Sequence, residues 1–412
     1  MAANTRHYRR RRPPAVADGA PVGLDYQPSG SGPFLWQAFD AATVWADLAA
    51  ISRAGFGLVR VGLAWDSFMP DARGVDRRRL GEFDTLLRTA MRHHLLVIPV
   101  LFAQAHGDCV LLPSRTVLRR RPRQGVRVLS EGSVEPGGPR DLWTDPLMLE
   151  LAHRWLREMI AGFSGHPAIF AWDLGDDPAA VVRPRRIADL AAWVRLMAGP
   201  LREQGDRVQL TLGADDICQA RGVRLASLAA HLDHIDVAVR PAQLRWLGLT
   251  AVSAVRFLAE LAQALTGEAA TPLGLAVATT SPGEDTEGID DREAGAFATQ
   301  LMERRAESGL AGLRARWWSD LQPRLGERAP FDRNGWLLRS GLVSVDGSEK
   351  PVLKPWIHAA RLGADPSPRR PWPEGLDAEG FYANLPDSLL DLAAGWSRVR
   401  EDHPGILGSS GA

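Results

Sequence analysis

Hydrophobic and polar positions follow two recurring patterns along this chain. Short apolar, β-branched runs alternate with longer amphipathic stretches, which is the pattern of strand–helix units in a parallel sheet. The predicted strands cover residues 22–26, 58–63, 95–102, 168–174, 207–212, 235–239, 272–278 and 312–317. The predicted helices cover residues 42–54, 77–94, 145–164, 181–204, 222–231, 251–266, 289–308 and 347–362.

Eight strands and eight helices in strict alternation, over about 340 residues, predict an α/β fold of the (β/α)8 TIM barrel kind. A doubly wound open sheet is the alternative, but no glycine-rich phosphate loop follows an early strand. Two helix ends have typical signals. Asp145 precedes Pro146 as an N-cap residue precedes a first-turn proline, and Gly55 follows the first helix.

Two long connections interrupt this alternation, at residues 104–144 and 319–346. Each follows a predicted strand, so in a barrel both would lie on the C-terminal rim, where binding and catalytic sites are built. The first connection carries an arginine cluster at residues 119–121, Arg123 and Arg127. We therefore expect rim loops that contribute to a site.

Composition changes mark the ends of the barrel. We expect residues 1–21 to be a disordered Arg-rich tail and residues 22–362 to form the barrel. Residues 363–404 would be a C-terminal extension with one helix at 386–399, packed on the barrel or loosely tethered to it. Residues 405–412 would be a disordered tail.

The composition is that of an ordinary globular protein. Formal net charge is zero over 412 residues, so nothing global favours nucleic acid or an anionic membrane as a partner. We find no apolar run long enough for a membrane span and no signal peptide. Two distant cysteines form neither a disulfide framework nor a metal-ligand cluster. We expect a bacterial, cytoplasmic protein with no metal or other cofactor.

The segment 168–178 is the most informative motif. It reads Ala-Ile-Phe-Ala-Trp-Asp-Leu-Gly-Asp-Asp-Pro, a buried strand that ends on two carboxylates, Asp176 and Asp177. It resembles the strand-four motif of the clan A glycoside hydrolases, the cellulase and β-mannanase branch. In that family the motif usually ends Trp-Asp-Leu-Gly-Asn-Glu-Pro, and the Glu is the general acid/base.

Further segments extend this resemblance over residues 22–362. In order along the chain they are residues 23–28, 56–60, 65–68, 142–146, 165–168, 317–320 and 341–351. The resemblance implies retaining hydrolysis by two carboxyl groups, at the ends of strands four and seven. It also implies that Asp177 takes the acid/base position, that Arg60 is the arginine that supports the nucleophile, and that Trp318 belongs to a tryptophan platform.

Three strands depart from the family pattern together. On strand seven, Ala276, Val277 or Ala278 stands at the nucleophile position, and none of these side chains can attack or carry charge. On strand six, Ala238 and Arg240 occupy the usual His and Tyr positions. On strand four, the family's Asn and Glu are both replaced by aspartate. These joint departures predict a degenerate active site.

Alternatives remain open at several of these residues. Asp177 is one methylene shorter than glutamate and would still donate a proton if its loop moved inward, or it would only cap the following helix. Arg240 would pair with Asp176 or Asp177 and hold that carboxyl ionised. Glu284 and Asp285 would hold a water as in an inverting mechanism, or would simply be solvated.

Several side chains could line a binding cleft. The aromatic candidates are Trp65, Trp246, Trp317, Trp318 and His106, with core packing as the alternative reading. The predicted binding residues are Arg60, Asp176, Trp318, His106 and Arg240. We also expect Asp177, Ala238, Val277 and Trp318 to converge on one face of the barrel.

Three functions follow from this reading. The first is a degenerate glycosidase-like barrel that binds a carbohydrate or a protein partner without retaining hydrolysis. The second is an active O-glycosyl hydrolase on β-linked glycans, with Asp177 as acid/base. The third is a structural or assembly module that uses the rim loop and the C-terminal extension as interaction surfaces.

Overall fold

The computed structural model describes residues 22–70, 74–102, 105–218, 223–266, 273–277, 291–304, 312–362 and 376–401. Both predicted tails, 1–21 and 405–412, lie outside the described residues. Glu284, Asp285 and Ala278 also lie outside them, so the predictions made for these three residues stay predictions.

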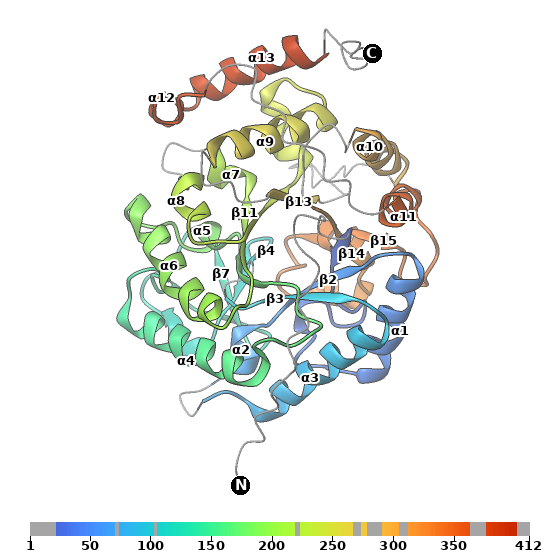
Figure 1. Ribbon diagram of the computed structural model, residues 1–412. Helices are drawn as coiled ribbons and strands as arrows, with labels where there is room; N and C mark the ends of the chain where they lie inside the picture. Colours follow the sequence, from blue (N-terminus) through green and yellow to red (C-terminus); the bar gives the residue numbers. More distant parts are fainter. Residues whose placement is uncertain are drawn as a thin grey trace.

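Eight parallel strands close into a barrel at the centre of the molecule (Figure 1). The order is sequential, and the last strand pairs with the first. The strands are β1 (Gly23–Asp25), β2 (Leu58–Gly62), β3 (Leu96–Val100), β10 (Trp172–Asp176), β11 (Val208–Gly213), β12 (His234–Val239), β13 (Leu273–Val277) and β14 (Gly312–Ser319). A ninth strand, β15 (Gly341–Val343), pairs with β14 beyond the closed ring. The predicted (β/α)8 TIM barrel is confirmed.

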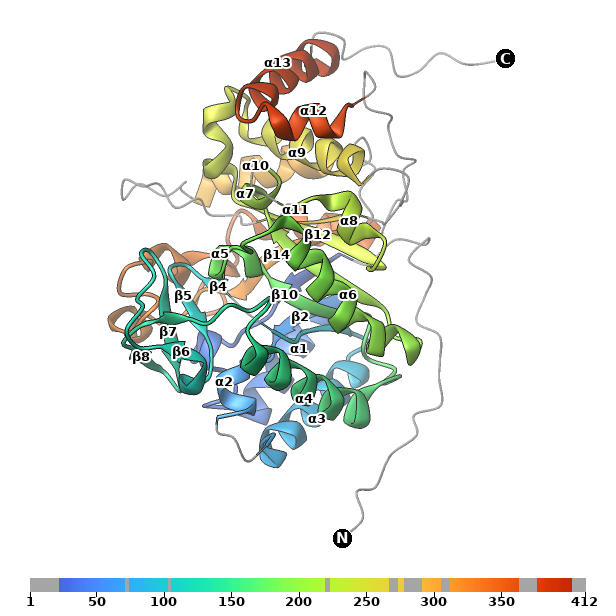
Figure 2. The ribbon, with the colours of Figure 1, turned by 90° about the vertical axis from the view of Figure 1, so that its left-hand side faces the viewer.

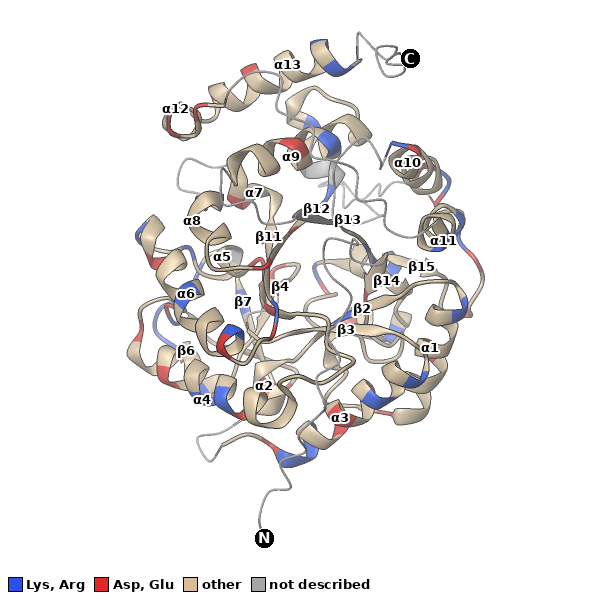
Figure 3. Ribbon diagram, in the orientation of Figure 1, with Lys and Arg blue, Asp and Glu red and all other residues tan. Residues whose placement is uncertain are grey.

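Helices surround the barrel and bury their apolar faces against it (Figure 1). They are α1 (Ala41–Arg53), α3 (Arg77–Arg92), α4 (Pro146–Phe163), α6 (Ile187–Glu203), α8 (Leu225–Ala229), α9 (Ala251–Leu265), α10 (Asp291–Glu303) and α11 (Leu353–Leu362). Charged positions of both signs are interspersed over these outer helices (Figure 3). Within the described ranges, no helix is long and apolar enough to cross a membrane.

Local sequence signals set several helix ends. Asp145 caps α4, because its carboxylate accepts hydrogen bonds from the backbone amides of Leu147 and Met148 at 3.0 and 3.2 Å. Gly55 has a φ of +99°, the left-handed region that a glycine after a helix adopts easily. Both predicted signals are confirmed.

Some predicted boundaries are displaced. The fourth strand forms at Trp172–Asp176, whereas its predicted first residues are joined to β3 only by an isolated bridge between Val97 and Ile169. Helix α6 begins at residue 187, not 181, because Pro184 disfavours helix in the residue before it. The later fourth strand places Asp176 inside the sheet and Asp177 directly after it.

The connection 104–144, expected as a loop, contains a small four-stranded sheet. Its strands are β4 (Ala105–His106), β5 (Cys109–Leu111), β7 (Arg127–Ser130) and β8 (Ser133–Glu135), and β6 (Val117–Leu118) pairs with β9 (Gly138–Pro139) beside it. The connection 319–346 contains two 3-10 helices, η6 (Pro323–Glu327) and η7 (Gly335–Arg339), besides β15. Figure 2 shows both connections on the same side of the barrel.

Arg127 ties these two rim connections together. Its guanidinium contacts the carboxylates of Asp108 and Asp332, each through hydrogen bonds of 2.7 and 2.8 Å. The Asn334 amide adds a 2.8 Å hydrogen bond to Asp108. Gly107 has a φ of +61°, and a Cβ there would lie 2.4 Å from Asn334 Cγ. The close approach of the two connections therefore requires glycine at this position.

The C-terminal extension packs against α9 (Figure 2). It forms two helices, α12 (Ala378–Ala383) and α13 (Asp387–Glu401), where one was predicted. The Trp396 ring meets Phe257 edge-on, and its Nε1 donates a 2.9 Å hydrogen bond to the buried Glu260. Arg400 forms an ion pair of 3.1 Å with the same carboxylate. Helix α9 is thus enclosed between the barrel and the extension, which explains its nearly continuous apolar sequence.

Replacement of Trp396 tests this packing. Trp396→Ala removes a ring that is 2% exposed and leaves Glu260 without one of its donors. We expect the free energy of unfolding to fall by about 3–5 kcal/mol, measured by urea denaturation. Val399→Ala on the same helix is the control, because Val399 is 48% exposed. Equal effects of the two substitutions would contradict a structural role for the extension.

Candidate functional site

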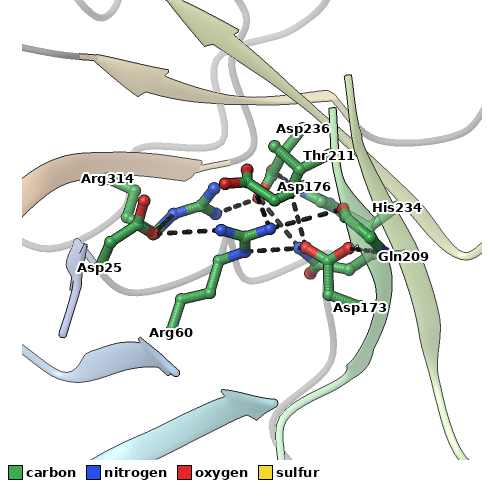
Figure 4. Close-up of polar contacts among 10 residues, drawn as sticks. Asp25, Arg60, Asp173, Asp176, Gln209, Thr211, His234, Asp236 and Arg314 are labelled. Atoms are coloured by element: carbon green, nitrogen blue, oxygen red, sulfur yellow. Dashed lines mark hydrogen bonds and ion pairs between the residues drawn. The ribbon is translucent and has the colours of Figure 1, made fainter. Parts of the chain in front are cut away.

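Two arginines enter the barrel and hold its carboxylates together (Figure 4). Arg60 of β2 donates a 2.9 Å hydrogen bond to Asp173 and forms ion pairs with Asp176 at 3.2 Å and Asp25 at 3.7 Å. Arg314 of β14 donates a 2.6 Å hydrogen bond to the same oxygen of Asp25. Both guanidinium groups are almost completely buried, so these carboxylates provide the compensation that buried charge requires.

A second layer of the network lies beneath the first. Asp236 of β12 forms a close ion pair with Arg314 and a 2.7 Å hydrogen bond with His234. The Gln209 amide donates at 3.0 Å to both Asp236 and Asp173, and the Thr211 hydroxyl donates to Asp173 at 2.7 Å. These side chains come from four strands and point into the barrel. The barrel interior at this level is therefore polar and closely connected.

The network separates the pKa values of the two carboxylates at its upper edge. Burial raises the pKa of Asp176, but the charges of Arg60 and then Arg316 outweigh it, and the pKa of Asp176 lies below its ordinary value. Burial also raises the pKa of Asp25, and there the attraction of Arg314 and Arg60 does not fully offset it. Asp176 is thus the more acidic of the two groups.

A cleft opens above this network at the C-terminal mouth of the barrel. One part, of about 510 Å³, is lined by residues that include Gln27, His106 and Trp317. The adjoining part, of about 770 Å³, is lined by residues that include Asp177, Gly213, Ala238, Arg240 and Ala276. Asp25, Asp176 and Arg316 line both parts, so the two form one continuous cleft.

Asp177 lies in this cleft with an unusual backbone conformation. Its φ and ψ are +50° and +53°, in the left-handed region that aspartate tolerates better than most residues. It stands at the N-cap position of α5 (Pro178–Val181), but its side chain makes no capping hydrogen bond. Instead the carboxylate lies over Gly213, where a Cβ would be 2.6 Å from Asp177 Oδ2. A side chain at position 213 would therefore displace the Asp177 carboxylate.

The carboxyl group of Asp177 is hydrogen-bonded to a second carboxyl group, that of Asp216 in α7 (Ala214–Ile217). The pKa of Asp216 is well above its ordinary value, because of burial first, then the charge of Asp177 and the hydrogen bond between the two side chains. Asp216 is accordingly the protonated member and donates to Asp177. The acid/base position is thus one half of a proton-sharing pair.

Strands six and seven present small side chains to the cleft. Ala276 lies opposite Ala238 on one neighbouring strand and Arg314 on the other, and Arg314 points into the barrel. Ala276 therefore faces the interior, since paired residues of neighbouring strands share a face. Val277 is 1% exposed and belongs to the hydrophobic core, and part of it also lines the cleft. Among the described residues of β13, the inward position near the mouth is alanine.

His106 reaches the cleft from β4. Burial lowers the pKa of His106 to about 4, which makes the ring neutral at physiological pH. Its Nε2 is buried and has no hydrogen-bond partner within the part of the chain that the structure describes. The His106 ring is therefore uncharged and has an unpartnered nitrogen beside the cleft.

Arg240 also lines the cleft, but it lies beside Arg316 and above Trp336 of η7. The ion pair of Asp176 is made instead by Arg60. Of the two predicted pairings of Arg240, with Asp176 or with Asp177, the ion pair of Asp176 is thus made by Arg60, and the pairing with Asp177 stays a prediction.

The tryptophans divide between the cleft and the core. Trp317 lines the cleft, whereas Trp318 packs edge-on against Phe56. Trp65 is buried against Phe102, and Trp246 is half exposed. Of the four residues expected to converge, Asp177, Ala238 and Val277 line the same part of the cleft. Trp318 does not line it, and its neighbour Trp317 does.

Several site residues were missed by sequence reasoning. They are Asp25, Asp173, Asp216, Asp236, Arg314 and Arg316. A signal was present on β14, where Arg314 and Arg316 alternate with apolar residues in a strand that must be largely buried. Charge at every second position of a barrel strand indicates side chains that point inward. Within the described ranges, no group of His, Cys, Asp or Glu side chains could hold a metal ion.

Comparison with known proteins identifies the fold. The sequence matches no protein-family model and no curated protein. A GH5_18 protein from Streptomyces cattleya, solved in complex with Manβ1-4GlcNAc, superposes with a TM-score of 0.73 at 20% identity, over 93% of this chain and 92% of that chain. A GH5_18 protein from Bifidobacterium longum subsp. infantis superposes with a TM-score of 0.69 at 18% identity, over 84% of this chain and 80% of that chain.

An exo-β-1,4-mannosidase from Opitutaceae bacterium strain TAV5 gives a TM-score of 0.67 at 20% identity over 83% of this chain. This chain spans only 59% of that enzyme's length. At these identities the likeness concerns the fold. The chain has the (β/α)8 barrel fold of the clan A glycoside hydrolases, as the motifs predicted.

The Asp177–Asp216 pair predicts a pH-dependent stability. In the unfolded chain Asp216 releases its proton near pH 4, whereas its pKa in the folded chain is well above that value. Between these two values the folded state holds a proton that the unfolded state has lost. Stability should therefore fall as pH rises through this window, by about 1.4 kcal/mol per pH unit.

Asp216→Asn keeps a neutral donor to Asp177 and removes this titration. We expect its melting temperature to fall less than that of the wild type between about pH 5 and about pH 8, measured by calorimetry. Asp391→Asn, on the exposed face of α13, is the control and should leave the wild-type slope unchanged. A steep slope retained in Asp216→Asn would show that the pair does not share a proton.

Proposed function

We propose that the cleft binds a β-linked carbohydrate and does not carry out retaining hydrolysis. The fold supports a carbohydrate ligand, because neighbours with this barrel were solved with Manβ1-4GlcNAc or GlcNAc bound, or are described as β-1,4-mannosidases. The cleft lies at the C-terminal mouth of the barrel, where ligands of this fold bind. A protein ligand and a purely structural role remain the alternatives that the sequence raised.

The observation that carries the proposal is the absence of a free carboxylate pair around the described part of the mouth. On strand seven the inward residue is Ala276, which cannot attack an anomeric carbon. On strand four the Asp177 carboxyl is hydrogen-bonded to Asp216 and lies over Gly213. Retaining hydrolysis needs two carboxyl groups about 5–5.5 Å apart across the scissile bond.

Recognition in this cleft would be mainly polar. Trp317 is only 4% exposed, so its face is largely covered and offers little stacking area. The buried His106 Nε2 and the buried Gln27 amide nitrogen have no partner among the described residues, and both side chains line the cleft. Such groups cost free energy while unpaired and gain hydrogen bonds from sugar hydroxyls.

Hydrolysis by another carboxyl pair is the second candidate function. It is favoured by one observation, the opposite pKa shifts of Asp25 and Asp176 in the same cleft. Carboxyl groups whose environments separate their pKa values are typical of an acid and base pair. Asp176 is, however, ion-paired with Arg60 at 3.2 Å, which weakens it as a nucleophile.

Binding and turnover measurements test the proposal together. We expect Manβ1-4GlcNAc or β-1,4-mannotetraose to bind in calorimetric titrations, with no hydrolysis above background and no covalent labelling by fluoro-sugar reagents. His106→Ala should weaken binding about tenfold, since it removes one hydrogen bond to the ligand. His358→Ala, exposed on α11, should have no effect.

Two other outcomes would show which part of the proposed function is wrong. Turnover that disappears in Asp25→Asn or Asp177→Asn would establish the hydrolase instead. Failure of any carbohydrate to bind, with His106→Ala and the wild type alike, would overturn carbohydrate binding itself.

A further inference from the structure

Two arginines in the cleft form no ion pair with the carboxylate network in the described part of the chain. Arg240 follows β12 and Arg316 lies in β14, and both line the larger part of the cleft. Their guanidinium carbons lie 5.7 and 5.3 Å from the centroid of the same ring, that of Trp336. Among the described residues, neither guanidinium has a carboxylate within ion-pair distance, and the buried Nε of Arg316 has no hydrogen-bond acceptor.

The acidic groups of the same cleft are already engaged elsewhere. Asp176 pairs with Arg60, Asp25 with Arg314, and Asp177 with the protonated Asp216. Arg240 and Arg316 therefore lie side by side with no ion-paired carboxylate on either guanidinium among the described residues. Burial and then the charge of Arg240 lower the pKa of Arg316 to about 10, and the attraction of Asp176 and Asp25 does not fully offset them.

Such a cluster costs free energy in the unliganded chain. Two guanidinium groups that repel each other in a partly desolvated cleft are stabilised when an anion lies between them, and guanidinium binds carboxylate or phosphate through paired hydrogen bonds. The Trp336 ring fixes the position of both side chains by cation–π contact. The η7 segment that carries Trp336 is itself anchored through Asn334 to Asp108.

We propose that Arg240 and Arg316 bind an anionic substituent, a carboxylate or a phosphate ester, on the carbohydrate that occupies the cleft. This inference rests on the proposed carbohydrate binding and names its ligand class, an acidic sugar. The neutral His106, which lines the smaller part of the cleft together with Arg316, would then contact a sugar hydroxyl and add no charge.

A matched pair of ligands tests the inference. β-1,4-Tetramannuronate and β-1,4-mannotetraose differ only at C6, a carboxylate in one and a hydroxymethyl group in the other. We expect calorimetric titration to give at least about tenfold tighter binding of the tetramannuronate, a preference that decreases as salt is added. Mannose 6-phosphate tests the phosphate ester in the same way.

Variants assign the preference to these residues. Arg240→Gln should reduce tetramannuronate binding about tenfold and reduce mannotetraose binding much less. Arg316→Lys keeps the charge of this more buried residue but loses the paired hydrogen bonds, so it should show a smaller loss of the same sign. Arg245→Gln, exposed in the segment that follows Arg240, is the control and should behave as the wild type.

Each outcome is decisive. Equal affinity for the neutral and acidic tetrasaccharides and for mannose 6-phosphate, unchanged in Arg240→Gln, would overturn the inference while carbohydrate binding stands. A preference for mannose 6-phosphate alone, lost in Arg240→Gln, would support the inference with a phosphate ester as the anion. Binding of none of these probes would overturn the inference and the proposed function together.

Discussion

The rest of the site depends on the Arg60 guanidinium, which is 4% exposed and surrounded by three carboxylates. A buried arginine without partners would cost several kcal/mol, and so would each carboxylate if the arginine were removed. Because Asp173 and Asp176 lie on the same strand and both contact Arg60, this one cation fixes the end of strand four. Asp177 then leaves the strand in its left-handed conformation and turns to Asp216.

The same constraint decides which groups remain available for chemistry. Arg60 and Arg314 together bind Asp25, Asp173, Asp176 and Asp236, so the carboxylates of the mouth are largely committed to the protein itself. Among the described residues, what remains for a ligand is a pair of guanidinium groups, a neutral imidazole and a buried amide. This combination is suited to the recognition of a polar, acidic ligand, which is the function proposed above.

Much of the fold could be predicted from sequence, because the alternation of apolar runs and amphipathic segments reports burial directly. The site was harder, since it is built from contacts between residues far apart in the chain. The resemblance implied that Arg60 supports a nucleophile, whereas in the structure three carboxylates contact it, and one of them, Asp25, is 35 positions earlier. Nothing local to either residue indicates that contact.

The sequence also could not predict which side chains of a strand face into the barrel. Trp318 was predicted to face the cleft, but a register shift lies between Leu24 and Asp25, where Asp25 pairs with Trp317. A bulge of this kind reverses which side chains of a strand face inward, and no periodicity argument detects it. The proton-sharing pair of Asp177 and Asp216 was also missed. The two residues follow different, neighbouring strands, so no local pattern in the sequence links them.

The most direct test of this account is to restore the missing carboxylates. Asp177→Glu is combined in turn with Ala276→Glu, Val277→Glu or Ala278→Glu, the three candidates for the family's second carboxyl position, and hydrolysis of 4-nitrophenyl β-mannoside by each purified double variant is measured. The account predicts no activity above background. The charges of Arg240 and Asp176, in place of the family's tyrosine and asparagine, would still surround the scissile bond, and stabilisation of the transition state depends on those surroundings. Restored hydrolysis would contradict it and show that only two carboxyl groups separate this chain from a working glycosidase.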